Sequence, residues 1–248
     1  MFAGTRFSIM TYNVHSCIGN DGKNMPMRIA KIIAGMNPDI VALQELDVGL
    51  RRTGGVDQAQ LIADELDMYF HFHPSLTIHD GRYGNAILSR FPLRIVKTGG
   101  LPSRRKEPRR GALWVEIKVS GTPIQVINTH LGLTPPRRRV QSKMLIGPDW
   151  LGSAECIPPV ILCGDMNATP GSYVHHAFSR NLTDAQNLLP GKHRPRRTWP
   201  SVSPFLRVDH VFLSKGISVR NVRTPRSMDA KMASDHLPLL VEAQLTNG

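Results

Sequence analysis

The chain has little of what marks secreted, membrane-spanning or disordered proteins. Its 248 residues include three cysteines, Cys17, Cys156 and Cys163, an odd count without CxxC spacing that argues against a disulfide framework. No run of about 20 apolar residues is present, so we expect no transmembrane helix. Residues 1–9 lack an apolar signal core and lead directly into a strand-like segment. We therefore expect a cytoplasmic protein without a secretory signal.

Aromatic and acidic residues are also scarce. Aromatics make up 6% of the chain, and no basic stripe interleaved with aromatics indicates a stacking platform for nucleic-acid bases. The 31 Lys and Arg outnumber 19 Asp and Glu, which gives a net charge of +12. Such a surface attracts nucleic acid, anionic phospholipid or phosphorylated metabolites, although a solvated basic face is the alternative. The basic residues cluster at 104–106, 109–110, 137–139 and 192–197.

The remaining composition is that of a folded domain. With 41% hydrophobic and 20% charged residues, the chain can bury a substantial core. No repeat or low-complexity linker divides it, so we expect one domain over residues 1–248, acting as a monomer.

Apolar periodicity predicts alternating helices and strands. Helices are expected over Pro26–Met36, Gln58–Leu66, Arg137–Ile146 and Tyr173–Phe178. In the second of these, Leu61, Ile62 and Leu66 are predicted to face inward. Strands are expected over Phe7–Tyr12, Ile40–Leu43, Asn85–Ser89, Leu93–Thr98, Ala112–Val119, Pro123–Asn128, Val160–Cys163, Val208–Leu213, Ile217–Val222 and Leu237–Ala243. This order indicates two packed sheets covered on their outer faces by helices.

Polar residues with metal-binding chemistry recur where these strands end. The segment Gly164–Pro170 follows a buried strand and places Asp165 and Asn167 two residues apart, on one side if the extended geometry persists. Such a pair suits a hard metal ion, a water and a phosphate oxygen, although Gly-Asp-x-Asn is also ordinary turn chemistry. Similar residues stand at five other strand ends: Asn13, Glu45, Asn128–His130, Asp209–His210 and Asp235–His236. Six coincidences favour one shared site, because loops at strand ends converge on a rigid scaffold.

The ordered motifs TYNVH, LQE, YGNAILSR, INTHL, GDMNATP, RVDHVFLS and SDHLPLL resemble those of the endonuclease/exonuclease/phosphatase superfamily over residues from about 8 to 245. The resemblance implies a deoxyribonuclease I-like, four-layer α/β/β/α sandwich with two mixed β-sheets. It also implies divalent-metal-dependent cleavage of phosphate esters, with Mg²⁺ or Mn²⁺ as cofactor.

The same resemblance assigns roles near the metal and the attacking water. Glu45 matches the principal metal carboxylate, and Mg²⁺ takes few protein ligands and keeps its waters. Asn13 resembles the amide beside metal and phosphate. Asp165 resembles the residue that activates the attacking water, and Asn167 the amide that contacts the scissile phosphate. Asp235 resembles a further metal ligand.

The histidines receive separate interpretations. His236 resembles the phosphate-facing imidazole and Asp209 its orienting carboxylate, because imidazole titrates near neutrality and can donate to a phosphate oxygen. His130 matches deoxyribonuclease-like and sphingomyelinase-like members, whereas apurinic-site endonucleases usually carry Tyr there. It is a catalytic candidate that either assists the leaving group or binds phosphate, and a hydrogen-bonded structural histidine is the alternative. His15 also departs from the apurinic-site pattern. The remaining histidines lack a carboxylate at metal-ligand spacing and are interpreted as surface or core residues: His71, His73, His79, His175, His176 and His193.

Two further segments are candidates for phosphate binding. Arg109 and Arg110 lie in a segment that resembles a phosphate-contacting arginine segment, and guanidinium groups bind phosphate in a bidentate way. The sequence does not say which arginine does so, and a solvated basic turn is the alternative. Asn85 lies close to the site by the same resemblance, where it either binds phosphate or shapes its loop.

The sequence therefore predicts a metal-dependent phosphodiesterase. A nuclease is favoured by the basic clusters. An enzyme acting on phospholipid or small phosphodiesters is favoured by His130 and by the compact chain. A catalytically silent module that binds phosphate or nucleic acid on the same fold is the alternative from another class.

Overall fold

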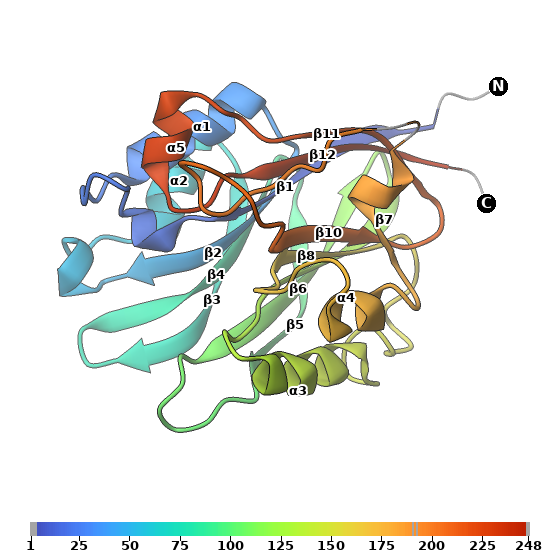
Figure 1. Cartoon of the computed structure of the whole chain (residues 1–248), viewed down its shortest axis with the longest axis horizontal. Helices are drawn as coiled ribbons and strands as arrows, with labels where there is room; N and C mark the ends of the chain where they lie inside the picture. Colours follow the sequence, from blue (N-terminus) through green and yellow to red (C-terminus); the bar gives the residue numbers. More distant parts are fainter. Residues whose placement is uncertain (1–3, 190, 192, 247–248) are drawn as a thin grey trace.

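The computed structural model describes residues 4–189, 191 and 193–246, and these form two six-stranded sheets packed face to face (Figure 1). The predicted basic residue Lys192 lies outside the described residues. The first sheet has the order β11 (Ile217–Arg223), β12 (Leu239–Leu245), β1 (Arg6–Asn13), β2 (Ile40–Val48), β4 (Gly81–Ser89) and β3 (Tyr69–Ile78). The second has the order β5 (Leu93–Leu101), β6 (Arg110–Val119), β7 (Thr122–His130), β8 (Val160–Asp165), β10 (Asp209–Leu213) and β9 (Thr183–Asp184).

Each sheet is mixed, and its outer face is covered by helices (Figure 1). The parallel pair β1–β2 is joined through α1 (Pro26–Met36), and the parallel pair β7–β8 is joined through α3 (Pro135–Ile146). The first sheet carries α1, α2 (Gln58–Leu66) and α5 (Met228–Ala233). The second carries α3 and α4 (Tyr173–Phe178). The predicted four-layer α/β/β/α sandwich is confirmed.

Three apolar layers hold the four structural layers together. Residues such as Ile9, Val126 and Val211 fill the space between the sheets. Separate clusters lie under α1 and α2 and under α3 and α4. Because both faces of the central strands are buried, their sequences read as continuous apolar runs rather than alternating ones. Ile40–Leu43 is an example, since all four residues are fully buried.

The structure corrects several details of the sequence prediction. Leu61 is 38% exposed, because the buried stripe of α2 runs through Ala59, Ile62, Ala63 and the partly buried Leu66. Strand β3 and helix α5 were not predicted. The β3 strand lies at a sheet edge, is half-buried and is interrupted by a bulge after Pro74, so it shows no clear apolar period. Among the described residues, no helix is long and apolar enough to cross a bilayer.

Candidate active site

The polar residues at the strand ends share one face and one edge of the sandwich. On β1, β7, β8 and β10 the inward-facing residues belong to the core between the sheets. Asp165 and Asp209 occupy the next inward positions on β8 and β10, and Asn13 and His130 lie one inward position further along β1 and β7. His130 is in register with Asp165, and Asp165 is in register with Asp209. The twofold alternation of a strand therefore collects these side chains at the end of the inter-sheet core.

Asp165 lies at the centre of this group and is 1% exposed. Its Oδ2 accepts a hydrogen bond from Asn13 Nδ2 at 3.0 Å and lies 3.4 Å from His130 Nε2 and 3.6 Å from His236 Nε2. Its Oδ1 accepts from the backbone N–H of Asn167 at 2.8 Å. Burial raises the pKa of Asp165, and the opposing effects of His236 and Asn13 do not cancel it. Asp165 is therefore a carboxylate with more affinity for a proton than an exposed one.

His236 carries a positive charge beside this carboxylate. Its Nδ1 lies 2.9 Å from Asp209 Oδ2, and the two side chains are almost fully buried. Burial alone would lower the pKa of His236, but the negative charges of Asp209 and Asp165 outweigh it and raise the pKa to about 10. Ser234 Oγ accepts from the His236 backbone N–H and donates to the Asn13 carbonyl, which fixes this segment against β1.

The glycine of Gly164-Asp165-Met166-Asn167 is required by packing. Gly164 has φ of +139°, and a Cβ atom there would lie 1.8 Å from the carbonyl oxygen of Thr129 on the neighbouring strand. Asn167 has φ of +46°, in the left-handed region that Asn tolerates. This turn brings the Asn167 carboxamide back to the backbone oxygen of Leu131 at 2.9 Å and to His130 at 3.0 Å. The motif is both a turn and part of the candidate site.

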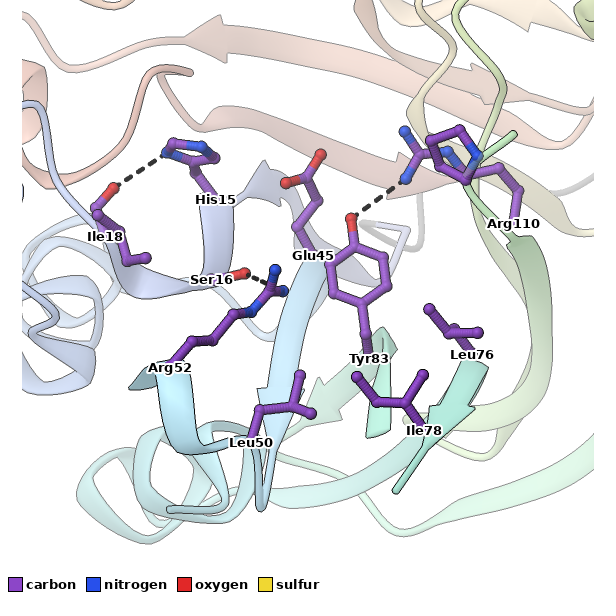
Figure 2. Close-up of a pocket in the computed structure, with 11 residues that line it drawn as sticks. His15, Ser16, Ile18, Glu45, Leu50, Arg52, Leu76, Ile78, Tyr83 and Arg110 are labelled. Carbon is purple, nitrogen blue, oxygen red and sulfur yellow. Dashed lines mark hydrogen bonds between the residues drawn. The ribbon is translucent and has the colours of Figure 1, made fainter. Parts of the chain in front are cut away.

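Glu45 is aimed by a bulge in β2. The pairing of β2 with β4 shifts between Leu43 and Leu46, and Glu45 has φ of +63°, which is unusual for a residue other than glycine. Leu43 and Leu46 both pack in the cluster under the helices. Glu45 instead accepts from Asn13 Nδ2 at 3.2 Å, and its side chain is 20% exposed at the edge of an open cavity (Figure 2). A strained backbone therefore directs a carboxylate into accessible space.

Asn128 holds this bulge in place from the opposite sheet. Its side-chain amide donates to the carbonyl oxygens of Leu43 and Ala86, the last paired residues before the register shift. Gln44 Nε2 donates to Asn128 Oδ1 at 2.8 Å. Asn128 is fully buried. The strand-end position of Asn128 predicts that it lies among the site residues. In the structure it lies behind them and links the two sheets.

His130 is a neutral imidazole in this environment. Its side chain is 2% exposed, and burial lowers its pKa well below the usual value, with Arg110 and His236 lowering it further. Because Asn167 donates its amide nitrogen towards His130 Nε2, the ring proton belongs on Nδ1. That nitrogen lies 3.7 Å from Glu45 Oε1. His130 thus lies between Glu45 and Asp165.

The two candidate arginines differ in burial and in their hydrogen bonds. Arg110 is 6% exposed, its NH1 donates to the hydroxyl of Tyr83 at 3.1 Å, and its Nε has no hydrogen-bond partner. Arg109 is exposed. Asn85 donates its amide to the carbonyl of Gly111 at 3.1 Å, which ties β4 to the start of β6 beside Arg110. Among these residues, Arg110 combines burial with an unused donor.

Asp235 occupies a more open position than the other carboxylates. Its Oδ1 lies 4.0 Å from His15 Nδ1, and its side chain is 36% exposed. Ser234, which precedes it, contacts Asn13. The predicted metal residues Glu45 and Asn13 are in direct contact, and Asp235 lies on the adjoining loop.

A second buried cluster was not predicted. Asp184 Oδ2 lies 2.9 Å from His175 Nε2, 3.1 Å from His210 Nδ1 and 2.6 Å from a guanidinium nitrogen of Arg207. His175, predicted to be a surface or core residue, is buried, and its carboxylate partner lies nine residues further along the chain in β9. His210 also contacts the backbone oxygen of Ala168, in the loop after Asp165. No sequence spacing indicated this cluster, because its members come from three separate segments: α4, β9 and residues 207–210.

Comparison with known proteins identifies the family. A sequence profile described as the Endonuclease/Exonuclease/phosphatase family matches residues 10–236. The chain belongs to this family.

The similar proteins cover the chain almost completely. An uncharacterised protein of Escherichia coli K12, YbhP, is 25% identical over 96% of this chain and 96% of its own length. A mannosyl-6-phosphatase of Bacteroides thetaiotaomicron, Bt3783, superposes with a TM-score of 0.75 at 22% identity over 96% of this chain and 99% of that one. The human Nocturnin catalytic domain with a bound sulfate anion gives a TM-score of 0.73 at 22% identity, covering 98% and 94% of the two chains. These structural likenesses show the shared fold.

Proposed function

We propose that the protein is a divalent-metal-dependent phosphodiesterase. In this reaction Asp165 acts on the attacking water and His236 acts on a phosphate oxygen. The observation that carries the proposal is the contact between a buried carboxylate with a raised pKa and a buried imidazolium, 3.6 Å apart. Titratable groups whose surroundings separate their proton affinities are typical of acid–base sites. Membership of a family of phosphoester hydrolases supports phosphorus as the reacting centre.

The donor set suits Mg²⁺ or Mn²⁺. Glu45 offers a partly exposed carboxylate beside Asn13, with Asp235 on the adjoining loop. Hard cations of this kind take oxygen ligands, and Mg²⁺ keeps several waters, which an accessible carboxylate permits. We propose that Glu45 holds the ion, with Asn13 and Asp235 next to it. When bound, the metal would supply positive charge against the phosphate oxygens.

The chain's own residues would perform the proton and charge movements. Asp165 takes a proton from the attacking water, because its raised pKa makes it a base that works near neutral pH. His236, kept protonated by Asp209, donates to a non-bridging phosphate oxygen as negative charge gathers there. Asn167 contacts the phosphate by exchanging the hydrogen bond of its amide nitrogen to His130 for one to a phosphate oxygen. His130, as a neutral imidazole, accepts from Asn167 before this exchange and lies between Glu45 and Asp165.

Arg110 is the arginine that we propose for phosphate binding. Its buried guanidinium has an unused Nε donor, whereas exposed Arg109 would pay more entropy to order itself. We also propose that residues 1–248 form one domain and that the protein is a cytoplasmic monomer.

A metal-dependent activity screen tests the proposal. Plasmid DNA, RNA, phospholipid vesicles, bis(p-nitrophenyl) phosphate and the monoester p-nitrophenyl phosphate are each offered with Mg²⁺, Mn²⁺ or EDTA. We expect metal-dependent turnover of at least one diester, faster than that of the monoester. Steep loss of DNA cleavage with salt would favour a nuclease over an enzyme for small diesters. Binding of these ligands without turnover under any metal would replace the proposal by the silent binding module.

A further inference from the structure

An open cavity of about 350 Å³ adjoins the candidate active site and shares Glu45 and Arg110 with it (Figure 2). It lies between the loop after β1, the segment after the β2 bulge and the hairpin of β3 and β4. The volume falls at the lower end of the range for sites that bind small molecules. The cavity therefore has room for one compact organic group beside the phosphorus centre.

The end of the cavity next to the hydrolytic residues is polar. The Arg110 guanidinium lines this end, and Tyr83 accepts from its NH1, which leaves the Tyr83 hydroxyl proton free to donate. Burial raises the pKa of Tyr83, so the hydroxyl stays protonated. Two donors thus face the carboxylate of Glu45 at this end (Figure 2). Such a set suits the oxygens of a phosphate group.

The other end of the cavity is apolar. Leu50, Leu76 and Ile78 lie together opposite Glu45 and Arg110 (Figure 2). Ile78 is 46% exposed, so a large apolar side chain stands at the cavity wall without a partner from the chain. An apolar group that fills this end would remove such surface from water, which favours binding.

The charges of the lining argue against a second phosphate. Arg52 also lines the cavity, but Asp47 pairs with it through two contacts of 2.7 Å. The Arg52 charge is therefore largely neutralised by a buried carboxylate. With one guanidinium paired and the other placed at the hydrolytic end, the cavity suits one anionic group and one uncharged group.

We infer that this cavity is the substrate-recognition pocket for a small phosphoester that carries a compact apolar or aromatic ester group. The inference rests on the proposed phosphoester hydrolysis and names its substrate class. Arg110 and Tyr83 hold the phosphate oxygens, while Leu50, Leu76 and Ile78 contact the organic group. Within this cavity a small molecule is favoured, because among the described residues Arg110 is the one lining guanidinium without a carboxylate partner, whereas a nucleic-acid strand presents successive phosphates.

Two non-hydrolysable phosphonates test the inference by binding alone. Phenylphosphonate and methylphosphonate carry the same anionic group and differ in the group that would enter the apolar end. Isothermal titration calorimetry of the full chain with Mg²⁺ measures both dissociation constants. We expect phenylphosphonate to bind at least about tenfold more tightly, the scale of selectivity typical of an apolar pocket.

Substitutions at the two ends separate their contributions. Ile78→Asp is expected to abolish most of the preference for phenylphosphonate by placing a negative charge in the apolar wall. Ile95→Asp is the matched control, because Ile95 is 45% exposed on β5 and does not line the cavity. Tyr83→Phe is expected to weaken both phosphonates by the same factor, since it removes a contact to their common group.

The outcomes distinguish this inference from the proposed function. Equal affinities of wild-type protein for the two phosphonates, or equal effects of Ile78→Asp and Ile95→Asp, would overturn the pocket and leave hydrolysis untouched. A phenyl preference lost in Ile78→Asp alone, in a protein that hydrolyses no phosphoester, would support the pocket and refute the proposed function.

Discussion

Two buried clusters of Asp and His lie on opposite faces of β10 and use the same residue types differently. Asp209 points between the sheets, where it contacts His236, and His210, the next residue, points outward to Asp184. Each cluster contains three groups of the kind that bind metal ions. The difference between them is the presence of a permanent counter-charge.

The cluster around Asp184 is electrostatically complete. Burial alone would raise the pKa of Asp184, but hydrogen bonds from His175 and His210 and the charge of Arg207 lower it well below its usual value. Arg207 occupies the same carboxylate oxygen that a metal ion would use. In the other cluster, Asp165 keeps a raised pKa and Asp209 Oδ1 has no hydrogen-bond partner. Arg207 Nε also lacks a partner, so the contrast lies in the carboxylates: Asp184 is held by opposite charge and stabilises the fold, whereas Asp165 and Asp209 retain capacity for a ligand.

The largest expected effect comes from breaking the cluster around Asp165. Asp165→Asn should lower kcat on whichever phosphoester the protein hydrolyses by about 1000-fold, because the base for the attacking water is lost. Thermal unfolding should change little or rise, since a desolvated carboxylate is removed. Activity within tenfold of wild type would exclude Asp165 from the reaction.

Breaking the cluster around Asp184 should reverse this pattern. Asp184→Asn leaves the charge of Arg207 without its buried partner, and the free energy of unfolding should fall by about 3 kcal/mol. The fall is measured by urea denaturation. The matched control is Asp149→Asn, whose carboxylate is 72% exposed and pairs with Lys97 at 3.6 Å. It should lose less than about 1 kcal/mol. Equal stability of the two variants would show that the buried network does not stabilise the fold.

Asn128 tests whether a network that stabilises the fold can also shape the site. Asn128→Leu leaves the carbonyls of Leu43 and Ala86 buried without a donor, and unfolding free energy should fall by about 2 kcal/mol. Because these carbonyls flank the bulge that aims Glu45, the half-saturating concentration of Mg²⁺ for activity should rise as well. Lower stability with an unchanged Mg²⁺ requirement would limit Asn128 to joining the sheets.

The smallest effect is a dependence of stability on pH. The pKa of Asp184 is lowered from 3.8 in the folded state, so its stabilising contribution is present above pH 3.8 and is lost as pH falls towards the folded-state pKa. The stability difference between wild type and Asp184→Asn should therefore shrink below about pH 4. Urea denaturation at several pH values between 5 and 2.5 measures it. A difference that grows on acidification would contradict the lowered pKa.

Much of the fold could be predicted from local patterns. Long apolar runs such as Ile40–Leu43 and amphipathic segments such as Pro26–Met36 fix their own element type, because burial on two faces or on one stripe leaves a periodic trace. Edge strand β3 escaped prediction because a half-buried strand with a bulge leaves no such trace. Leu61 was wrongly predicted to face inward. The small residues Ala59 and Ala63 share the buried face of α2 with Ile62, and Leu61 lies outside it.

The candidate site was predictable in membership but not in geometry. Asp165, Asp209 and His236 were identified by their strand-end motifs, and the structure places His236 2.9 Å from Asp209 and 3.6 Å from Asp165. The hydrogen bond between Arg110 and Tyr83, and the burial of Arg110 beside an exposed Arg109, depend on how the hairpins pack and could not be predicted from the sequence. The cluster around Asp184 left no trace in the sequence, because each contact joins residues from different segments.

By itself, the sequence determined the two-sheet architecture, the family and the residue types gathered at one edge, since these follow from periodicity and from ordered motifs. The tertiary structure alone decided which carboxylate is charged, which histidine is neutral and which arginine is buried. Proton affinity depends on desolvation and on nearby charges, and both are set by residues that are distant in the chain and close in space.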